Sequence, residues 1–380
     1  MKTLVVTGAN LVWSGGRPRG GHITYGLQWL LGLERLGYRV LYLDFLAAAA
    51  GDRDTISSAQ QVFSESVAEW WPPESVGLLL EPSMQCIYGL PIDRLLRVIR
   101  ESAALIILSV PGRPLPDLIS DIRPRVLIEQ DPGYSHLWGN NADPAVIFGT
   151  PDVAFTVGAN IGTPRCLLPT HGIDWRPLWN PVVMSLWDSD RPILRDRFTT
   201  VATWWGGEYV EFGGRMLGPK AEEFRKFVDL PEYTSETLEI ALEIEPDDPD
   251  LPYMREHGWN IVDPTIVAGP KSYWEYVVSS LAEFSCTKGV YTGTQCGWFS
   301  DRSECYLAAA RPVVLQNTGF ADVLPTGKGL FTFESVEEAA EAIRAIRSDY
   351  ALHSKAAREI AKEYFDSEIV LSRLLSEVGV

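Results

Sequence analysis

The chain has 380 residues, 46% of them hydrophobic, and a formal net charge of −17 at pH 7. A chain of this length and composition can bury a large core and is long enough for two domains, which excludes a disordered protein. The acidic balance, without a run of Lys or Arg, argues against nucleic acid as a partner.

The cysteines and the apolar segments indicate a cytoplasmic protein. The five cysteines are odd in number and scattered, with no Cys-x-x-Cys pair, so we expect a reducing compartment and no zinc site. The apolar start of the chain is too short for a signal peptide and is typical of a first buried strand. No apolar run reaches the roughly 18 residues of a membrane span. The sequence leaves the oligomeric state open, with a homodimer as one expectation.

The first half of the chain alternates apolar β-branched runs with helical patterns. Residues 3–8 and 38–45 are predicted strands, joined by a helix from about His22 to Leu36. A strand, a crossover helix and a second strand predict a parallel doubly wound sheet. An insertion from about Ala47 to Gly77 is expected to add helices at the sheet edge. Further strands are predicted to begin at Ala104, Arg125 and Val153.

A stretch rich in Pro, Trp and charge, residues 171–198, is typical of an interdomain connection, and we place the domain boundary near Asp190. A second alternating series follows, and from Val336 the chain is charged and helical. The sequence thus predicts an α/β fold with two Rossmann-like doubly wound domains, residues 1–190 and 191–350, and a C-terminal helix, residues 351–380, packing back toward the first domain. The predicted strands of the second series are 198–204, 238–244, 289–294, 312–316 and 329–333, and its helices are at about 219–228, 272–284 and around Arg302.

The first candidate site is the glycine-rich turn from Ser14 to Gly26, which holds Gly20, Gly21 and His22. It follows the first strand, and in open α/β sheets ligands bind at the carboxyl ends of strands. The alternative is a surface loop with His22 capping or solvated. The turn does not match G-x-G-x-x-G, so a dehydrogenase is disfavoured.

The second candidate site follows the strand at Arg125. Glu129, Asp131 and His136 offer a base, a hydrogen-bond acceptor and an aromatic neighbourhood. Carboxylate oxygens are strong acceptors for the hydroxyl groups of polyhydroxyl ligands. Asp131-Pro132-Gly133 is equally an ordinary turn, and the two interpretations carry equal weight.

The third candidate site lies between Ala282 and Ser303, where Lys288 and Arg302 flank a Gly- and Thr-rich stretch. The amides that begin a helix at Arg302 carry positive potential, so the stretch predicts a diphosphate site with a bidentate arginine and a lysine point charge. The alternative is ordinary surface charge.

A fourth, weaker candidate is the segment Gln316 to Phe320, whose amide and hydroxyl groups follow a predicted buried strand. A plain turn is the alternative there. Thr203 and Trp204 follow the first strand of the second series and are further candidates for ligand contact, with core packing as the alternative for Trp204.

Two segments in the second half of the chain resemble a known protein family. The segments SDRSECYLAAARPVVLQNTGF and LPTGKGLFTFESVEEAAEAI resemble the donor-binding half of bacterial GT-B glycosyltransferases, and the likeness in pattern covers Phe198 to Ile343. The Gly-His pair in the first turn resembles the N-terminal half of that fold. The resemblance implies two Rossmann-like domains around a cleft, with the nucleotide-sugar in the C-terminal domain and the acceptor in the N-terminal one.

The sequence departs from the glutamate pair E-x7-E of many retaining members. Counting back from Pro312, the second glutamate falls on Cys305, with Glu304 one residue earlier, and Ala310 replaces the usual glycine. The choice between inversion and retention therefore stays open, and Glu283 and Glu304 remain candidate contacts for donor hydroxyls.

The resemblance implies roles for the candidate residues. His22 is the candidate general base because imidazole titrates near working pH, Asp131 orients it or binds acceptor, and Glu129 is a substitute base. No metal or cofactor is expected, since helix N-termini and cationic side chains stabilise the leaving diphosphate in this fold. The other assigned residues are Thr203, Lys288, Arg302, Ser303, Thr318 and Gly319 for the donor, and Gly20, Gly21 and His136 on the acceptor side.

The resulting hypothesis is transfer of a sugar from a nucleoside diphosphate donor, such as a UDP- or TDP-sugar, to an acceptor hydroxyl or amine. A natural product, a glycan and a lipid-linked sugar are the acceptor classes considered. The alternatives are a nucleotide-sugar 2-epimerase, which needs no acceptor, and a non-catalytic nucleotide-sugar-binding protein.

Overall fold

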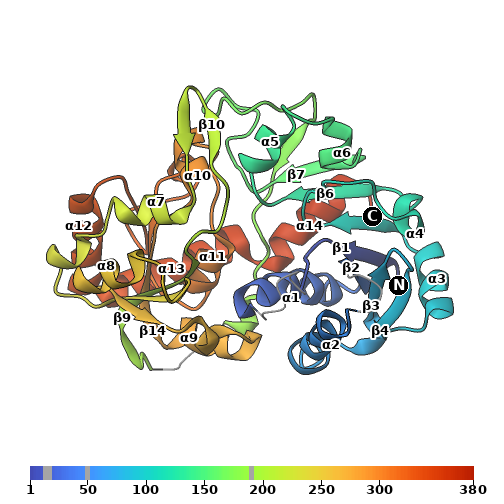
Figure 1. The fold of residues 1–380 in the computed structure, drawn as a ribbon, viewed down its shortest axis with the longest axis horizontal. Coiled ribbons are helices and arrows are strands. Elements are labelled where there is room, and N and C mark those ends of the chain that lie inside the picture. Colours follow the sequence, from blue (N-terminus) through green and yellow to red (C-terminus); the bar gives the residue numbers. More distant parts are fainter. Residues whose placement is uncertain (12–18, 48–51, 188–191) are drawn as a thin grey trace.

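The computed structural model describes residues 1–11, 19–47, 52–187 and 192–380. The chain forms two lobes, each built around its own sheet (Figure 1). The first sheet has the strand order β4-β3-β2-β1-β5-β6-β7-β8 and the second the order β13-β12-β9-β14-β15-β16. Within these two sheets every pair is parallel except β3 with β4. The predicted α/β fold with two doubly wound sheets is confirmed.

The first lobe follows the predicted order of elements, with one difference. The insertion predicted to add helices contains α2 but ends at the start of strand β3, because the run from Val76 is short and buried up to Leu80, as in a strand covered on both faces. The elements are β1 (Thr3–Thr7), α1 (Gly20–Arg35), β2 (Arg39–Ala47), α2 (Arg53–Gln61), β3 (Val76–Glu81), β4 (Gln85–Gly89), α3 (Ile92–Arg100), β5 (Ala104–Ile107), α4 (Asp117–Ser120), β6 (Arg125–Glu129), α5 (Tyr134–Trp138), α6 (Pro144–Phe148), β7 (Val153–Thr156) and β8 (Trp175–Pro177).

The second lobe differs from the prediction in its middle. Residues 289–294, predicted as a strand, form helix α10, and the strand is β14, which occupies the end of the predicted helix 272–284. The elements are β9 (Arg195–Thr203), β10 (Val210–Phe212), β11 (Arg215–Leu217), α7 (Lys220–Arg225), β12 (Leu238–Glu243), α8 (Asp250–Glu256), β13 (Asn260–Val262), α9 (Pro270–Ser279), β14 (Ser280–Ser285), α10 (Gly289–Thr294), α11 (Asp301–Ala308), β15 (Val313–Gln316), β16 (Leu330–Phe333), α12 (Val336–Ser348), α13 (Tyr350–Ile360) and α14 (Ser367–Val378).

The chain crosses between the lobes twice, and the two crossings lie side by side. The Val182 amide donates to the carbonyl of Phe365 at 2.7 Å, and the Ser367 amide donates to the carbonyl of Val182 at 2.9 Å. After the second crossing α14 packs on α1, and Leu371 enters the core of the first lobe. The predicted boundary at Asp190 lies outside the described residues.

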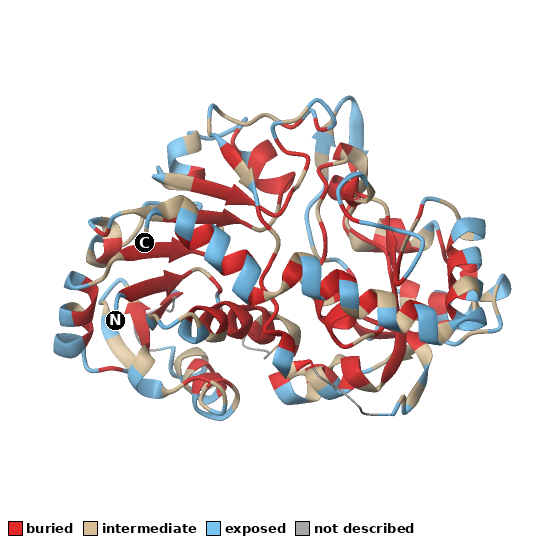
Figure 2. Cartoon of the chain, turned by 180° about the vertical axis from the view of Figure 1, so that it is seen from behind, coloured by how far each residue is buried: buried red, intermediate tan, exposed pale blue. Residues whose placement is uncertain are grey.

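Helix α1 is the central helix of the molecule and is buried over most of its surface (Figure 2). Its N-terminal end abuts the second lobe. A Cβ at Gly20 would lie 2.3 Å from the carbonyl oxygens of both Val267 and Gly269, and one at Gly21 would lie 3.0 Å from the Tyr273 ring. The two glycines therefore allow a close approach between the lobes.

We expect Gly20→Ala to lower the free energy of unfolding by about 1–3 kcal/mol, because its methyl group would overlap two backbone carbonyls that cannot move aside cheaply. Gly269→Ala is the matched control, since its methyl group would meet only the Ser272 hydroxyl, at 3.7 Å. Urea unfolding of both variants checks this. Equal stability of the two would contradict the tight contact between α1 and the second lobe.

Two further features are the lack of a membrane-spanning helix among the described residues and the state of the cysteines. Among the described residues no helix is long and apolar enough to cross a membrane. All five cysteines are free thiols.

Candidate functional site

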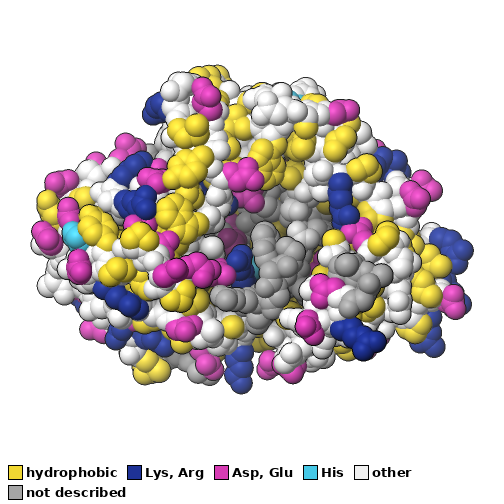
Figure 3. Space-filling model, in the orientation of Figure 1, with side chains coloured by type: hydrophobic (Ala, Val, Ile, Leu, Met, Phe, Trp, Pro, Cys, Tyr) yellow, Lys and Arg dark blue, Asp and Glu magenta, His cyan; other side chains and the backbone are white. Residues whose placement is uncertain are grey.

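Residues that follow strand ends of the two sheets meet between the lobes, where the molecular surface is hollowed (Figure 3). Asp131 follows β6 and Asn160 follows β7 in the first lobe, and Lys288 follows β14 and Gly319 follows β15 in the second. Ligands of open α/β sheets bind outside the carboxyl ends of strands. The space between the lobes is therefore the candidate site.

An ion pair joins the lobes across this site. Lys288 Nζ lies 2.9 Å from Asp131 Oδ1, and the Tyr291 hydroxyl donates to the same oxygen. Nζ also lies 5.1 Å from the centroid of the Tyr134 ring. Burial raises the pKa of Asp131, but the Lys288 charge and the Tyr291 hydrogen bond outweigh it and hold that pKa below its usual value. Asp131 is therefore a carboxylate bound to a cation.

A buried asparagine makes a second contact between the lobes. The side-chain Nδ2 of Asn160 donates to the carbonyls of Gln295 and Gly319, both at 3.1 Å. The backbone N–H of Asn160 donates to the carbonyl of Cys296 at 2.9 Å. Thr318 is fully buried, and its hydroxyl donates to the carbonyl of Trp298. Thr318 and Gly319 thus lie where the lobes touch. Asn160 was not predicted from the sequence, where its place after a predicted strand was its only signal.

Thr203 takes part in a third contact. Its hydroxyl donates to Glu243 Oε2 at 2.9 Å, and Arg19 Nη2 lies 2.9 Å from the same oxygen. Because Arg19 directly precedes α1, this ion pair joins the start of α1 in the first lobe to the ends of β9 and β12 in the second lobe.

Arg302 lies in the first turn of α11 and is held by three groups of its own lobe. Its Nε donates to Glu283 Oε1, Nη1 to the carbonyl of Val201 at 2.9 Å, and Nη2 to the Ser285 hydroxyl at 2.9 Å. The Arg302 side chain is 12% exposed and that of Glu283 is not exposed at all. A guanidinium has five N–H donors, so two remain to meet a ligand.

Two other polar residues of α11 are enclosed. Ser303 is fully buried, and its hydroxyl has no hydrogen-bond partner among the described residues. Glu304 is buried and accepts from the amide of Asn180 at 3.3 Å. Burial, followed by the charge of Asp301, raises the pKa of Glu304 well above its usual value. Oε2 of Glu283 and Oε2 of Glu304 are buried and have no hydrogen-bond partner among the described residues, and contact of either residue with donor hydroxyls stays a prediction.

Lys220 is a further cation at this site, and it was not predicted from the sequence. It is the first residue of α7, and its neighbours include Arg302 and Lys288. Burial, followed by the positive charges of Arg302 and Lys288, lowers the pKa of Lys220 to about 7. Within the described part of the chain no group accepts a hydrogen bond from its ammonium or forms an ion pair with it. A buried lysine held beside two other cations without an ion-pair partner is typical of an anion site.

His22 lies in the first turn of α1, and its Nε2 is 2.9 Å from the carbonyl oxygen of Asn10. Burial lowers the pKa of His22, and Asp301 offsets part of this effect. The imidazole is therefore neutral near pH 7. Donation from Nε2 to a carbonyl fixes the tautomer in which Nδ1 is the basic nitrogen.

The structure corrects the roles predicted for Glu129 and His136. Glu129 is fully buried, accepts from the hydroxyls of Ser135 at 2.7 Å and Thr156 at 2.8 Å, and has its pKa raised by burial to about 8. His136 is fully buried, with Nδ1 2.7 Å from the carbonyl oxygen of Pro169, and burial lowers its pKa to about 4. Both side chains belong to the interior of the first lobe, so neither reaches a ligand.

Comparison with solved structures gives similar chains at low sequence identity. HepE of Anabaena in complex with UDP is 14% identical over the full length of both chains, with a TM-score of 0.59. An alpha-glucosyltransferase in complex with UDP is 13% identical over the full length of both chains, with the same TM-score of 0.59. The chain has the GT-B fold. The sucrose-phosphate synthase of Thermosynechococcus elongatus shares it, at 9% identity over 99% of both chains and a TM-score of 0.55. No protein-family model and no curated protein sequence matches this chain.

Within the GT-B fold, the three cations lie where the order of the second sheet reverses. β9 and β14 are neighbours there, and the chain continues from them to opposite sides of the sheet. Arg302 binds both strands, through Val201 of β9 and Glu283 of β14. Such a switch point is the expected ligand position in a doubly wound sheet. No group of three His, Cys, Asp or Glu side chains that could hold a metal occurs in the described ranges.

Proposed function

We propose that this protein is a glycosyltransferase that moves a sugar from a nucleoside diphosphate sugar to an acceptor hydroxyl or amine. The observation that carries the proposal is the group of Lys220, Lys288 and Arg302 at the switch point of the second sheet, in a chain whose net charge is −17. A diphosphate is the ligand whose charge fits such a group. HepE was solved with UDP and with UDP-glucose, which makes UDP the first nucleotide to test.

The three cations would stabilise the diphosphate as it leaves the sugar. Arg302 is fixed by Glu283, so its two remaining N–H groups are oriented before the ligand arrives. Lys220 supplies an ammonium that forms no hydrogen bond or ion pair with any described group. Lys288 would exchange or share its contact with Asp131. In this proposal the side chains do the work of a metal ion, and no cofactor is needed.

The first lobe supplies the groups that meet the acceptor. The neutral imidazole of His22 can accept a proton from the attacking hydroxyl, and the Asp131 carboxylate can stabilise positive charge that develops on the sugar. One similar alpha-glucosyltransferase was solved with UDP and a 13-mer DNA. The net charge of −17 here disfavours a polyanionic acceptor, so we propose a small molecule or a glycan.

The direct test is release of UDP from UDP-glucose in the presence of an acceptor panel, with and without EDTA. The proposal predicts acceptor-dependent release that survives EDTA. An altered sugar nucleotide formed from the donor alone would instead indicate a 2-epimerase. Binding of the donor with neither reaction would indicate a nucleotide-sugar-binding protein.

We expect His22→Gln to lower turnover at saturating donor and acceptor by about 10²–10⁴-fold, the usual contribution of a general base. Glutamine can keep the hydrogen bond to Asn10, so the fold and the affinity for UDP should be retained. The pH–rate profile gives the check: the wild type should lose activity below the lowered pKa of His22, and the variant should lack this limb. Near-full turnover of the variant would show that His22 is not the base.

A further inference from the structure

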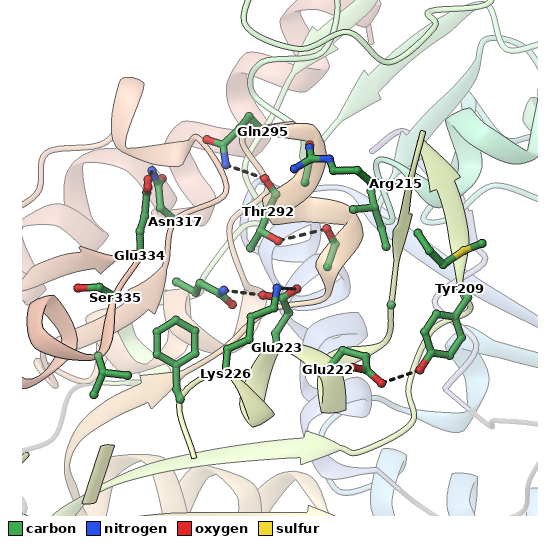
Figure 4. A pocket seen from close by; sticks show the side chains of 18 residues that line it. Tyr209, Arg215, Glu222, Glu223, Lys226, Thr292, Gln295, Asn317, Glu334 and Ser335 are labelled. Atoms are coloured by element: carbon green, nitrogen blue, oxygen red, sulfur yellow. Dashed lines mark hydrogen bonds and ion pairs between the residues drawn. The ribbon is translucent and has the colours of Figure 1, made fainter. Parts of the chain in front are cut away.

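A further cavity lies in the second lobe, and Gln295, whose carbonyl accepts from Asn160 of the first lobe, is part of its wall. Its volume is about 500 Å³, within the roughly 300–1,000 Å³ of small-molecule sites. The β10–β11 hairpin, α7, α10 and the residues that follow β15 and β16 form its walls (Figure 4). None of the residues assigned above to donor or acceptor lines it.

The cavity wall carries three carboxylates, of Glu222, Glu223 and Glu334, and two cations, Arg215 and Lys226. Glu222 pairs with Arg225 at 2.8 Å, and Glu223 pairs with Lys226 at 2.7 Å. Arg215 and Glu334 form no ion pair among the described residues and lie on opposite walls (Figure 4). An anion entering the cavity therefore meets more carboxylates than cations, which disfavours a phosphate or a nucleotide as the ligand.

The polar groups suit a ligand with many hydroxyls. Glu334 accepts from Asn317 Nδ2 at 2.7 Å and keeps further acceptor capacity, and Thr292 and Gln295 add a hydroxyl and an amide to the wall (Figure 4). Carboxylate and amide groups can together accept from and donate to each hydroxyl of a sugar. The cavity is thus chemically matched to a carbohydrate.

An aromatic ring lies on the hairpin side of the same cavity. The Tyr209 hydroxyl donates to Glu222 Oε1 at 2.7 Å, and a Cβ at Gly218 would lie 3.0 Å from the ring. Packing on Gly218 and the bond to Glu222 hold this ring in place, although Tyr209 is 53% exposed. A fixed ring offers an apolar face for the C–H groups of a sugar at low entropic cost.

The cavity is separate from the proposed donor site but adjoins it. Gln316 Nε2 donates to Glu223 Oε2 at 2.8 Å, and Gln316 Oε1 accepts from the amide of Thr287 at 3.0 Å. Lys288 is the next residue. The floor of the cavity is therefore hydrogen-bonded to the segment that carries one of the three cations.

We propose that this cavity binds a neutral carbohydrate. That the bound sugar is an outer unit of a glycan acceptor rests on the proposed function, whereas the site itself does not.

The test uses the full chain with ¹³C-labelled methionine methyl groups, because Met216 lines the cavity and the chain has only five methionines. Methyl glucoside, methyl galactoside, N-acetylglucosamine and maltotriose are titrated first without UDP and then with UDP in excess. We expect the Met216 signal to shift in a saturable way with at least one of them, and the Met254 signal to stay in place. Tighter binding of maltotriose than of the single sugars would point to a glycan, and the reverse to a free sugar.

Two variants and a control locate the binding. Thr292→Trp fills the cavity and Glu334→Gln weakens an acceptor in its wall, so each should lower the sugar affinity, the first by about tenfold or more. Glu337→Gln, exposed on α12 outside the cavity, should leave it unchanged. No Met216 shift with any of the sugars, loss of the shift in excess UDP, or unchanged affinity in both cavity variants would overturn the proposal. Absence of sugar transfer with a normal Met216 titration would refute the proposed function and leave this site standing.

Discussion

Replacing Asp131 by Asn is expected to lower turnover of a UDP-sugar by about 10²–10⁴-fold, because the variant keeps the shape of the side chain and loses its charge at the reacting centre. The carboxylate is ionised in the structure, since Lys288 and Tyr291 hold its pKa below the usual value against the effect of burial. The donor affinity should not fall, because Lys288 loses the one ion-pair partner it has among the described residues and can then bind the diphosphate. Turnover and Michaelis constants for donor and acceptor measure both effects.

Asp117→Asn is the control for Asp131→Asn, because Asp117 is an exposed acid of the same lobe, at the start of α4. It should behave as the wild type. If Asp131→Asn kept turnover within a few-fold of the wild type but changed the donor affinity, the role of Asp131 would be limited to the contact between the lobes.

Replacing Lys220 by Met is expected to weaken UDP binding by about 10–100-fold, since a hydrogen bond to a charged group contributes about 1.5–3 kcal/mol. Lys220 has no partner among the described residues, so removing its ammonium breaks no contact of the fold. Lys226→Met is the matched control at the C-terminal end of the same helix, because the Lys226 side chain is 60% exposed and pairs with Glu223. It should leave UDP affinity unchanged in a calorimetric titration.

The same residue predicts a pH dependence. With its pKa lowered to about 7, Lys220 is an ammonium below that pH and a neutral amine above it. Only the ammonium attracts a diphosphate, so UDP affinity should fall by about tenfold from about pH 6 to about pH 8. Lys220→Met should lack this fall, and the difference between the two proteins removes the titration of UDP itself. Parallel pH profiles would contradict the assignment of Lys220.

Much of the fold was predictable because its strands and helices have distinct local patterns. The strands that begin at Ala104, Arg125 and Val153 start where the sequence predicts. β14 was missed because all six of its residues are buried. Burial on both faces removes the alternation of a half-exposed strand, so the apolar run merges with the pattern of the preceding helix.

The candidate site was predictable only in part, because its contacts join distant segments. Lys288 and Asp131 were assigned to different ligands, yet they bind each other across 157 residues of sequence. Glu129 and Asp131 both carry a carboxyl group. Glu129 is buried and accepts a hydrogen bond from Ser135, whereas Asp131 binds Lys288 of the opposite lobe. Lys220 had no sequence signal beyond its place at a helix start. Its importance comes from two cations that the fold brings beside it.

The central claim is that the cations between the lobes bind a nucleoside diphosphate. Isothermal titration of the wild-type protein with UDP, TDP, ADP and GDP, repeated on Lys220→Met and Lys226→Met, tests it most directly. The account predicts one site per chain for at least one of these nucleotides, UDP being the first expectation, with binding weakened in Lys220→Met and kept in Lys226→Met. Absence of binding by all four nucleotides, or equal affinity in the wild type and Lys220→Met, would contradict it.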